Sequence, residues 1–426
     1  MPQRSSRFGI HNPPPPGIWI CLALCWLAPA KDARADAWPM FRGDRLASGV
    51  SKGTLPEQLE LLWTFSSPQG GFESTAAIVD GVVYAGSTDG KLYAIDLRSG
   101  KQRWEFVTEL GFNASPTVSG PSVFIGDVDG RFYSINARTG KANWTFSTDG
   151  EIDSSANLYK DCVLFGSQDS FLYCLKADTG KLAWKYQSTN QIRCFPTIIA
   201  GRAMIAGCDG SLHAIDLEHG ASVAEVPIES PTGCTAAAAG ETVFVGTEGN
   251  VFFAIDVQRA KILWRYESRE RSQPFRSSAA VAEGVVLVGS RDHLLHALAA
   301  DDGRPLWSFT SRGYVDSSPV VVQDRVFVGS ADGRLYGLDL KTGREVWRFE
   351  AGGAVSASPA VAAGRLVIGT NAGNLYCFGE PVAIEKPASG VPIDGLVAGV
   401  IALVALRALI ALCRSHSNAS GTRKPS

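Results

Sequence analysis

A tryptophan returns along this chain at a nearly constant interval. Successive positions lie 41, 40, 40, 80, 43 and 40 residues apart: Trp63, Trp104, Trp144, Trp184, Trp264, Trp307 and Trp347. The double interval spans one copy in which Ala224 stands where an indole is expected. A period near 40 residues with one large aromatic residue per copy is typical of an array built from one supersecondary unit.

Each copy contains four short apolar runs. In the clearest copy, residues 326–329, 335–339 and 345–349 are separated by Asp-Gly and Thr-Gly, and a run that starts at Asp316 precedes them. Such runs with tight turn residues between them predict antiparallel strands, here called A to D in chain order. Four antiparallel strands in every 40 residues predict the blades of a β-propeller.

Eight sets of A, B and C strands can be counted, but only seven D strands follow a C strand. The missing strand precedes the first set, at residues 61–65. If it pairs with the last blade, the ring closes and no sheet edge is left open. The sequence therefore predicts an all-β, eight-bladed propeller over residues 61–379, with an eighth blade made of residues 355–378 and 61–66.

The tryptophans are predicted to pack between neighbouring blades, since a buried indole brings a large apolar area to a seam. A glycine precedes most of them by four residues, as Gly140 precedes Trp144, and would allow a positive φ in the turn between strands C and D. Blade four has Ala224 for the tryptophan, and blade five has Ala260 for the glycine. The seams around blades four to six should be the least regular.

The repeat pattern Asp-x-x-Thr-Gly-Lys/Arg-x-x-Trp, as in residues 136–144, resembles that of pyrroloquinoline-quinone (PQQ) type propellers. The entry motif at residues 38–44, Trp-Pro-Met-Phe-Arg-Gly-Asp, is similar to the segment that leads into such domains in exported bacterial proteins. The resemblance covers residues 61–378. It implies one of two branches: quinoprotein alcohol dehydrogenases, or cofactor-free propellers such as the BamB-like assembly lipoproteins.

Several features favour the cofactor-free branch. The quinoprotein dehydrogenases that the chain resembles are longer and cover the quinone with a disulfide between adjacent cysteines, but no Cys-Cys pair occurs here. The loops between strands are short, and no set of Glu, Asn and Asp matches a calcium site. No catalytic motif is present either. We expect a non-enzymatic protein without cofactor, and PQQ with calcium is the alternative.

Both ends of the chain carry apolar segments. Residues 1–35 have basic residues, a 13-residue apolar run and an Ala-Arg-Ala cleavage sequence, which together predict a secretory signal peptide. A lead-in segment at 36–60 precedes the propeller, and a linker at 380–392 follows it. Residues 393–413 predict a transmembrane helix, and the basic tail at 414–426 is expected in the cytoplasm. The propeller would lie on the periplasmic or extracytoplasmic side of a single-pass membrane protein.

The charge balance and the cysteines bear on which partners and which cross-links are expected. The 40 basic and 42 acidic residues give a net charge of −2, without the basic footprint that nucleic-acid binding requires. Two cysteine pairs could form disulfides in an exported protein: Cys162 with Cys174 on one hairpin, and Cys194 with Cys234 on neighbouring A strands. The sequence leaves open whether they pair or are buried small residues. No metal site is predicted, and the histidines are expected in turns or on the surface.

The predicted A strands line the axis of the propeller, and alternate residues of a strand face the same side. One axial position carries the channel ring, our main candidate site: Glu73, Asn113, Asp153, Arg193, Arg276 and Asp316. Two residues further on, most blades have serine or threonine. A second candidate surface is the rim arginines of blades five and six: Arg265, Arg269, Arg271 and Arg291. Arginines often anchor protein interfaces.

Three functional hypotheses follow. The first is a membrane-tethered scaffold that binds unidentified protein partners. The second is a PQQ-dependent oxidoreductase, and the third is a sensor that holds a small polar ligand in the channel.

Overall fold

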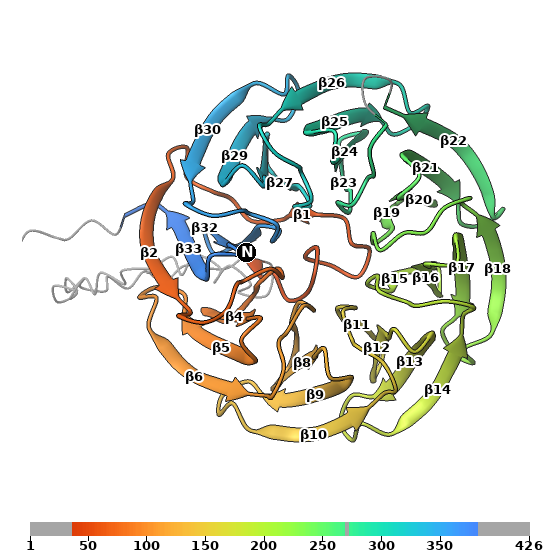
Figure 1. Cartoon of the computed structure of the whole chain (residues 1–426), viewed down its shortest axis with the longest axis horizontal. Coiled ribbons are helices and arrows are strands. Elements are labelled where there is room, and N and C mark those ends of the chain that lie inside the picture. Colours follow the sequence, from red (N-terminus) through yellow and green to blue (C-terminus); the bar gives the residue numbers. More distant parts are fainter. Residues whose placement is uncertain (1–35, 269–271, 382–426) are drawn as a thin grey trace, which may run out of the picture. The chain divides into compact units, whose positions relative to one another are not determined.

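The computed structural model describes residues 36–268 and 272–381. In this part of the chain, eight sheets stand around a common axis as the blades of a propeller (Figure 1). The predicted signal peptide, transmembrane helix and cytoplasmic tail lie outside the described residues, as does nearly all of the linker. A search of the described residues finds no helix that is long and apolar enough to span a membrane.

Each blade runs from strand A at the axis to strand D at the periphery (Figure 1). The A strands of blades one to eight are β3 (Ala77–Val79), β7 (Thr117–Ser119), β11 (Asn157–Tyr159), β15 (Thr197–Ile199), β19 (Ala237–Ala239), β23 (Ala280–Ala282), β27 (Val320–Val322) and β31 (Ala360–Ala362). The B strands are β4 (Val82–Gly86), β8 (Ser122–Gly126), β12 (Cys162–Gly166), β16 (Arg202–Ala206), β20 (Thr242–Gly246), β24 (Val285–Gly289), β28 (Arg325–Gly329) and β32 (Arg365–Gly369).

The C strands are β5 (Lys91–Asp96), β9 (Arg131–Asn136), β13 (Phe171–Lys176), β17 (Ser211–Asp216), β21 (Val251–Asp256), β25 (Leu294–Ala299), β29 (Arg334–Asp339) and β33 (Asn374–Gly379). The D strands of blades one to seven are β6 (Gln102–Val107), β10 (Ala142–Ser147), β14 (Leu182–Gln187), β18 (Ser222–Pro227), β22 (Lys261–Glu267), β26 (Pro305–Thr310) and β30 (Glu345–Glu350). The B and C strands are almost entirely buried, whereas the D strands alternate, because only one of their faces meets a neighbouring blade.

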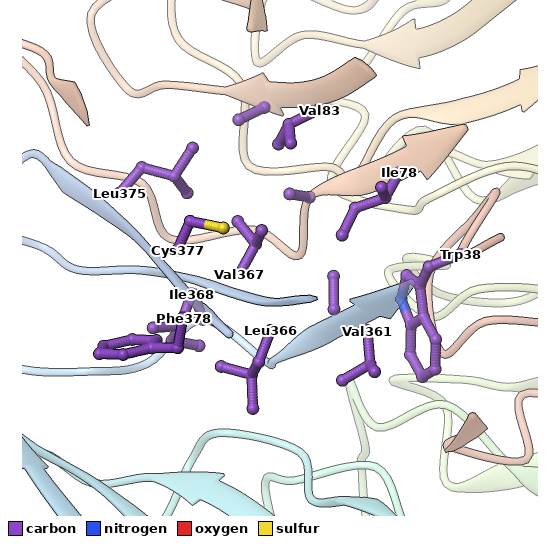
Figure 2. Close-up of a cluster of buried hydrophobic side chains, with 14 of the residues drawn as sticks. Trp38, Ile78, Val83, Val361, Leu366, Val367, Ile368, Leu375, Cys377 and Phe378 are labelled. Atoms are coloured by element: carbon purple, nitrogen blue, oxygen red, sulfur yellow. The ribbon is translucent and has the colours of Figure 1, made fainter. Parts of the chain in front are cut away.

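The closure of the ring follows the prediction. Strand β2 (Glu60–Ser66) pairs antiparallel with β33 and supplies the fourth strand of blade eight, with Trp63 opposite Cys377 and Thr64 opposite Tyr376. Figure 2 shows the core beside this junction, where Leu375 and Cys377 of blade eight pack near Ile78 and Val83 of blade one. The last blade is thus built from both ends of the propeller sequence.

Each tryptophan packs across a seam, as predicted. Its indole Nε1 donates a hydrogen bond to a backbone carbonyl of the next blade, for example Trp104 to Ala137 O at 3.0 Å and Trp63 to Leu97 O at 2.8 Å. Six of the seven indoles also lie against the glycine of the next C–D turn. A Cβ built on Gly140 would lie less than 3.0 Å from the Trp104 ring, and Gly140 has a φ of 70°. The glycine therefore provides both a positive φ and room for the indole.

The lead-in segment enters the channel, a position that the sequence did not predict. Its backbone carbonyls accept hydrogen bonds of 2.7–3.0 Å from one A-strand amide in each of six blades: Ile78, Val118, Ile198, Ala238, Val281 and Val321. Strand β1 (Val50–Ser51) runs parallel to β27 of blade seven. In blades three and eight, side-chain bonds between Asn157 and Arg45 O and between Ser51 and Val361 O replace the backbone contact. The lead-in thus contacts every blade from inside.

The two disulfides that the sequence left open are not formed, and all four thiols are free and buried. Cys162 and Cys174 do lie on one hairpin, but Cys162 is opposite Lys176 and Cys174 is opposite Leu164. The two cysteines are therefore diagonal neighbours. Cys194 and Cys234 lie in the loops just before strands β15 and β19, not on the A strands themselves, and the Cys234 thiol donates to Phe275 O of the next blade at 2.9 Å. Burial raises the pKa of both Cys194 and Cys234 to about 12.

Candidate functional site

The six channel-ring residues predicted from the repeat line one cavity of ≈ 200 Å³ at the axis. They lie just before the A strands, where the D–A loops enter the channel. Because the repeat places each residue at the same point of its blade, positions 40 residues apart in sequence meet around one hollow. The same cavity is lined by the second ring of mainly serine and threonine, and by Phe41 of the lead-in.

One side of the ring is acidic and amide-rich. The carboxylate of Asp153 accepts hydrogen bonds from Asn113 at 3.0 Å, Gln168 at 2.7 Å and Arg193 at 3.1 Å. Glu73 accepts a hydrogen bond of 3.3 Å from Asn371. These contacts join blades two, three and four to one another, and blade eight to blade one.

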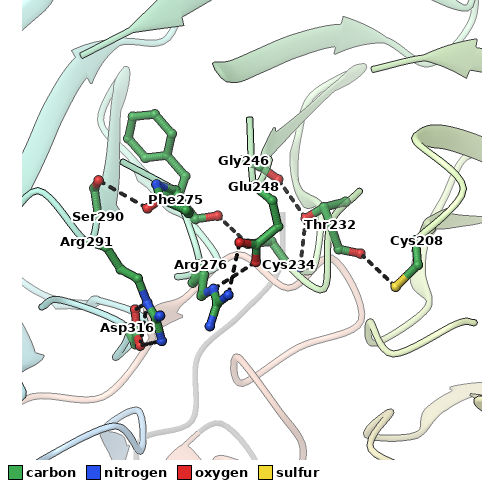
Figure 3. A network of polar contacts seen from close by, with 11 residues as sticks. Cys208, Thr232, Cys234, Gly246, Glu248, Phe275, Arg276, Ser290, Arg291 and Asp316 are labelled. Atoms are coloured by element: carbon green, nitrogen blue, oxygen red, sulfur yellow. Dashed lines mark hydrogen bonds and ion pairs between the residues drawn. The ribbon is translucent and has the colours of Figure 1, made fainter. Parts of the chain in front are cut away.

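The other side carries two arginine–carboxylate pairs (Figure 3). Arg276 binds both carboxylate oxygens of Glu248, at 2.8 and 3.0 Å, and Arg291 binds Asp316 at 2.7 Å. The hydrogen bond that Arg291 donates to Asp316 is the main reason why the pKa of Arg291 is raised. Charge-assisted pairs of this kind hold planar groups in fixed positions.

A gap interrupts the ring at blade five. The equivalent residue there is Gly233, and a Cβ built on it would meet no atom within 4 Å. Through this gap the cavity adjoins a second hollow of ≈ 470 Å³, which Arg193, Cys208, Glu248 and Arg276 also line. Two guanidinium groups therefore flank the one position of the ring that has no side chain.

The second ring is tied together by hydrogen bonds from blade to blade. In six neighbouring pairs of blades, a hydroxyl oxygen accepts the backbone N–H of the equivalent residue in the preceding blade, at 2.8–3.0 Å. The accepting residues are Ser115, Ser155, Thr235, Ser278, Ser318 and Ser358. The ring is incomplete at blade four, which has Phe195, and at blade one, where Thr75 Oγ1 is buried without a partner.

The floor of the cavity is aromatic. Phe41 packs on Phe195 with ring centroids 5.9 Å apart, and both residues line the cavity. Arg42, the next residue, is fully buried and donates to the carbonyls of Ala279 at 2.9 Å and Pro319 at 2.6 Å. Burial lowers the pKa of Arg42 to about 9, and Asp44 opposes that shift. Sequence reasoning missed Phe41, because nothing in the repeat places the lead-in at the axis.

The rim arginines do not form one group among the described residues. Arg265 lies on the outer strand β22 and pairs with Glu229 at 3.4 Å, whereas Arg291 belongs to the channel mouth through Asp316. Arg269 and Arg271 lie outside the described residues. Of this set, Arg291 alone can be assigned to the cavity entrance.

Two histidines expected in turns or on the surface are instead buried on C strands. His213 contacts Asp209 at 2.8 Å and His296 contacts Asp292 at 2.9 Å. Other blades have tyrosine at this position, as Tyr336 donates to Asp332 at 2.7 Å. The Asp-x-x-x-Tyr spacing in those blades is the signal that could have identified these pairs. The histidines thus replace a structural tyrosine.

Residues 36–268 and 272–381 contain no group of three or more His, Cys, Asp and Glu side chains that could hold a metal ion. Calcium in proteins takes six to eight oxygen ligands, several of them carboxylates. In the channel, Asp153 and Asp316 are each paired with an arginine. Two of the three carboxylates that line the cavity are therefore already engaged by arginines, and Glu73 is the third.

Solved structures with the same fold include both a BamB protein and quinoprotein dehydrogenases. BamB from Moraxella catarrhalis is 20% identical, with a TM-score of 0.64 over 76% of this chain and 98% of that chain. Quinohemoprotein alcohol dehydrogenase from Comamonas testosteroni is 16% identical, with a TM-score of 0.70 over 83% of this chain and 82% of that chain. At these identities the likeness shows the fold alone. No curated protein matches the chain.

The sequence profile described as outer membrane protein assembly factor BamB matches four overlapping stretches, residues 56–194, 149–223, 168–283 and 271–384. Together these stretches cover the whole propeller and well over half of the chain. The eight repeated blades, the closing strand and this match show that the chain belongs to the BamB-like family of PQQ-repeat β-propellers.

Proposed function

We propose that this protein is a cofactor-free scaffold that binds protein partners through the face around the channel mouth. In this proposal the segment at 393–413 anchors the chain in a membrane, and the propeller lies on the periplasmic or extracytoplasmic side. Similar solved structures include BamB and several dehydrogenases, so the choice rests on residues of this chain.

One observation carries the proposal. Tyr314, in the D–A loop beside the channel, is 45% exposed although it is a large aromatic residue. The Arg291 guanidinium lies over its ring, 5.2 Å from the centroid, and donates a hydrogen bond of 2.7 Å to Asp316. Tyrosine and arginine are enriched among residues that dominate binding energy at protein interfaces. This pair is held in place before binding, which reduces the entropy lost on association.

The same face has a second apolar anchor and short loops. Leu110, in the D–A loop after blade one, is 46% exposed. The loops at this end lie against each other, as Thr108 N donates to Gly90 O at 2.8 Å. They leave the channel mouth accessible to an inserted loop of a partner.

Site-specific photo-crosslinking in intact cells tests the proposal. A photoreactive residue at Tyr314 is expected to capture a defined partner, identified by mass spectrometry, and Arg291→Ala should reduce the yield roughly tenfold. A photoreactive residue at Arg304, which is 65% exposed in a C–D turn at the other end of the blades, is the matched control. Equal capture from both positions, or no effect of Arg291→Ala, would contradict the proposal that partners bind the face around the channel mouth.

The oxidoreductase alternative has its own test. The purified chain is titrated with PQQ in the presence of calcium, and absorbance, thermal midpoint and dye reduction are followed. We expect no saturable change, since Asp153 and Asp316, two of the three channel carboxylates, are each engaged by an arginine. A stoichiometric absorbance band with dye reduction would favour the quinoprotein hypothesis instead.

A further inference from the structure

The second ring presents hydroxyl groups whose protons have no acceptor among the described residues. In the six bonded pairs of the second ring, each hydroxyl oxygen accepts an amide hydrogen, and no described residue accepts the proton of that hydroxyl. Six O–H donors are thus positioned around one cavity. Because a hydroxyl keeps a second lone pair, each can either donate to a ligand or accept from it.

Thr75 strengthens this point. Its side chain lines the cavity and is only 2% exposed, yet its Oγ1 has no hydrogen-bond partner in the described part of the chain. A buried hydroxyl without a partner costs free energy, and a ligand that bonds to it recovers that cost. Ser74 Oγ, from the same segment, is also buried and without a partner.

The charges around the cavity favour a neutral ligand. The three guanidinium groups around the mouth are each paired with a carboxylate: Arg193 with Asp153, Arg276 with Glu248 and Arg291 with Asp316. Such pairing leaves no strong field of one sign, which a simple anion or cation would need. The same planar groups retain donors and acceptors that suit neighbouring hydroxyls of a ligand.

The aromatic floor adds a flat apolar surface. Phe195 occupies the blade-four position of the second ring, Phe41 of the lead-in packs on it, and both line the cavity. Sugars have just this combination of surfaces, since their ring C–H groups pack on aromatic side chains while their hydroxyls bond to polar ones. The cavity volume of ≈ 200 Å³ is below the roughly 300–1,000 Å³ of pockets for drug-sized ligands, so the buried part must be small.

We propose that the channel binds a neutral sugar, with one ring seated on Phe41 and Phe195 and its hydroxyls bonded to the second ring and to Glu73. The gap at Gly233 leaves room for a substituent or a second sugar to extend into the adjoining hollow. This site is separate from the protein contacts proposed for Tyr314, so either proposal can fail without the other.

Calorimetric titration of the purified full chain, in a detergent without a sugar headgroup, tests the site. The probes are D-glucose, D-galactose, D-mannose and N-acetyl-D-glucosamine, with sodium acetate and glycine as an anion and a zwitterion. We expect at least one of the four sugars to bind saturably with one-to-one stoichiometry at millimolar concentration. If none of them binds, or if acetate or glycine binds more tightly than every sugar, the proposal is wrong.

Variants locate the binding to the channel. Glu73→Gln and Phe195→Ser should each weaken the binding of that sugar about tenfold. Phe195→Ser restores the hydroxyl present in most other blades. Gly233→Ser is a second probe that should leave the fold intact, because its Cβ enters open space, and it should weaken only ligands that extend through the gap. Glu105→Gln, on outer strand β6, is the control, and equal affinity of all variants would place any binding outside the channel.

Discussion

At the residue scale, the one seam without an indole shows how two blades are matched. In six seams a tryptophan lies against a glycine of the next blade, so close that a Cβ on the glycine would be less than 3.0 Å from the ring. Blade four has Ala224 instead of tryptophan, and the matching residue of blade five is Ala260, with a φ of 49°. Loss of the large residue on one side therefore accompanies gain of a Cβ on the other.

This complementarity predicts a coupled pair of substitutions. Ala224→Trp alone should destabilise the protein by about 1–3 kcal/mol, because the indole meets the Ala260 Cβ in a packed seam. Adding Ala260→Gly should recover most of that loss, giving a coupling free energy of about 1–2 kcal/mol. A double-mutant cycle measured by denaturant unfolding checks this. A double variant no more stable than Ala224→Trp alone would contradict the matched seam.

The carboxylates of the C–D turns give the protein a defined acid sensitivity. Hydrogen bonds from Arg103 and Ser99 lower the pKa of Asp96 to about 2 from the ordinary 3.8. The pKa values of Asp216, Asp256 and Asp339 are also lowered, with hydrogen bonds in the same turns as causes. Groups whose pKa is depressed on folding stabilise the protein above the unfolded pKa, and that contribution disappears as the pH falls through the folded value.

We therefore expect the thermal midpoint to fall as the pH is lowered from about 4 to about 2. Asp96→Asn should flatten this dependence, since the amide oxygen can still accept the turn hydrogen bonds but cannot be protonated in this range. Blade two already uses this solution, because Asn136 Oδ1 accepts from Thr139 N at 3.0 Å. Differential scanning calorimetry across this pH range checks the prediction. An unchanged slope in the variant would show that Asp96 does not contribute.

At the element scale, strand β2 differs from the other D strands only in where its partner lies along the chain. In the usual case, as with Ser147 opposite Arg131 in blade two, the paired residues are close in sequence. In blade eight the equivalent pair is Ser66 opposite Asn374, and the side chains are 2.7 Å apart. The local pairing is the same, but in blade eight it joins the first strand of the propeller sequence to the last one.

A disulfide at this pair should stabilise the ring more than the same disulfide elsewhere. Ser66→Cys with Asn374→Cys would close a loop of about 300 residues, and the entropic stabilisation by a cross-link grows with loop length. Ser147→Cys with Arg131→Cys is the matched control, with a loop of about 16 residues. Thermal midpoints of the oxidised and reduced forms check the prediction. If the blade-two disulfide raised the thermal midpoint more than the blade-eight disulfide, the prediction that linking the two ends of the propeller stabilises it most would be wrong.

At the scale of the whole molecule, the lead-in joins the blades to one another through the channel. Its contacts reach A strands from Ile78 in blade one to Val321 in blade seven, and Arg42 ties it to two further carbonyls. Without it, the inner edges of the A strands would carry unpaired backbone groups. The lead-in thus provides the floor of the cavity and satisfies the inner edges of the sheets.

Deleting residues 36–52 should leave the blades folded but loosen their inner strands. Hydrogen–deuterium exchange is expected to speed up at the amides of Val118, Ala238 and Val281, which donate to the lead-in. Amides of the central B strands serve as the internal control, because their partners are unaffected. Unchanged exchange at the A strands would show that these contacts do not stabilise the channel.

Much of the architecture could be predicted because it repeats. A residue at one place in the repeat must occupy the same place in every blade, so the period by itself put Glu73 and Asp316 on one ring and assigned β2 to blade eight. The seam tryptophans followed for the same reason. These features depend on local strand pairing and on a regular hydrophobic pattern, and both can be recognised in short windows of sequence.

The remaining features depend on contacts that do not recur from one blade to the next. The position of Phe41 below the ring and the pairing of Arg276 with Glu248 arise from segments that meet only after the ring has closed. The cysteine geometry was likewise decided by hairpin register, which set Cys162 opposite Lys176. Sequence alone therefore determined the number of blades, their closure and the axial ring. Tertiary structure decided the floor and the polar network of the cavity, because contacts between distant, unrepeated segments leave no periodic signal.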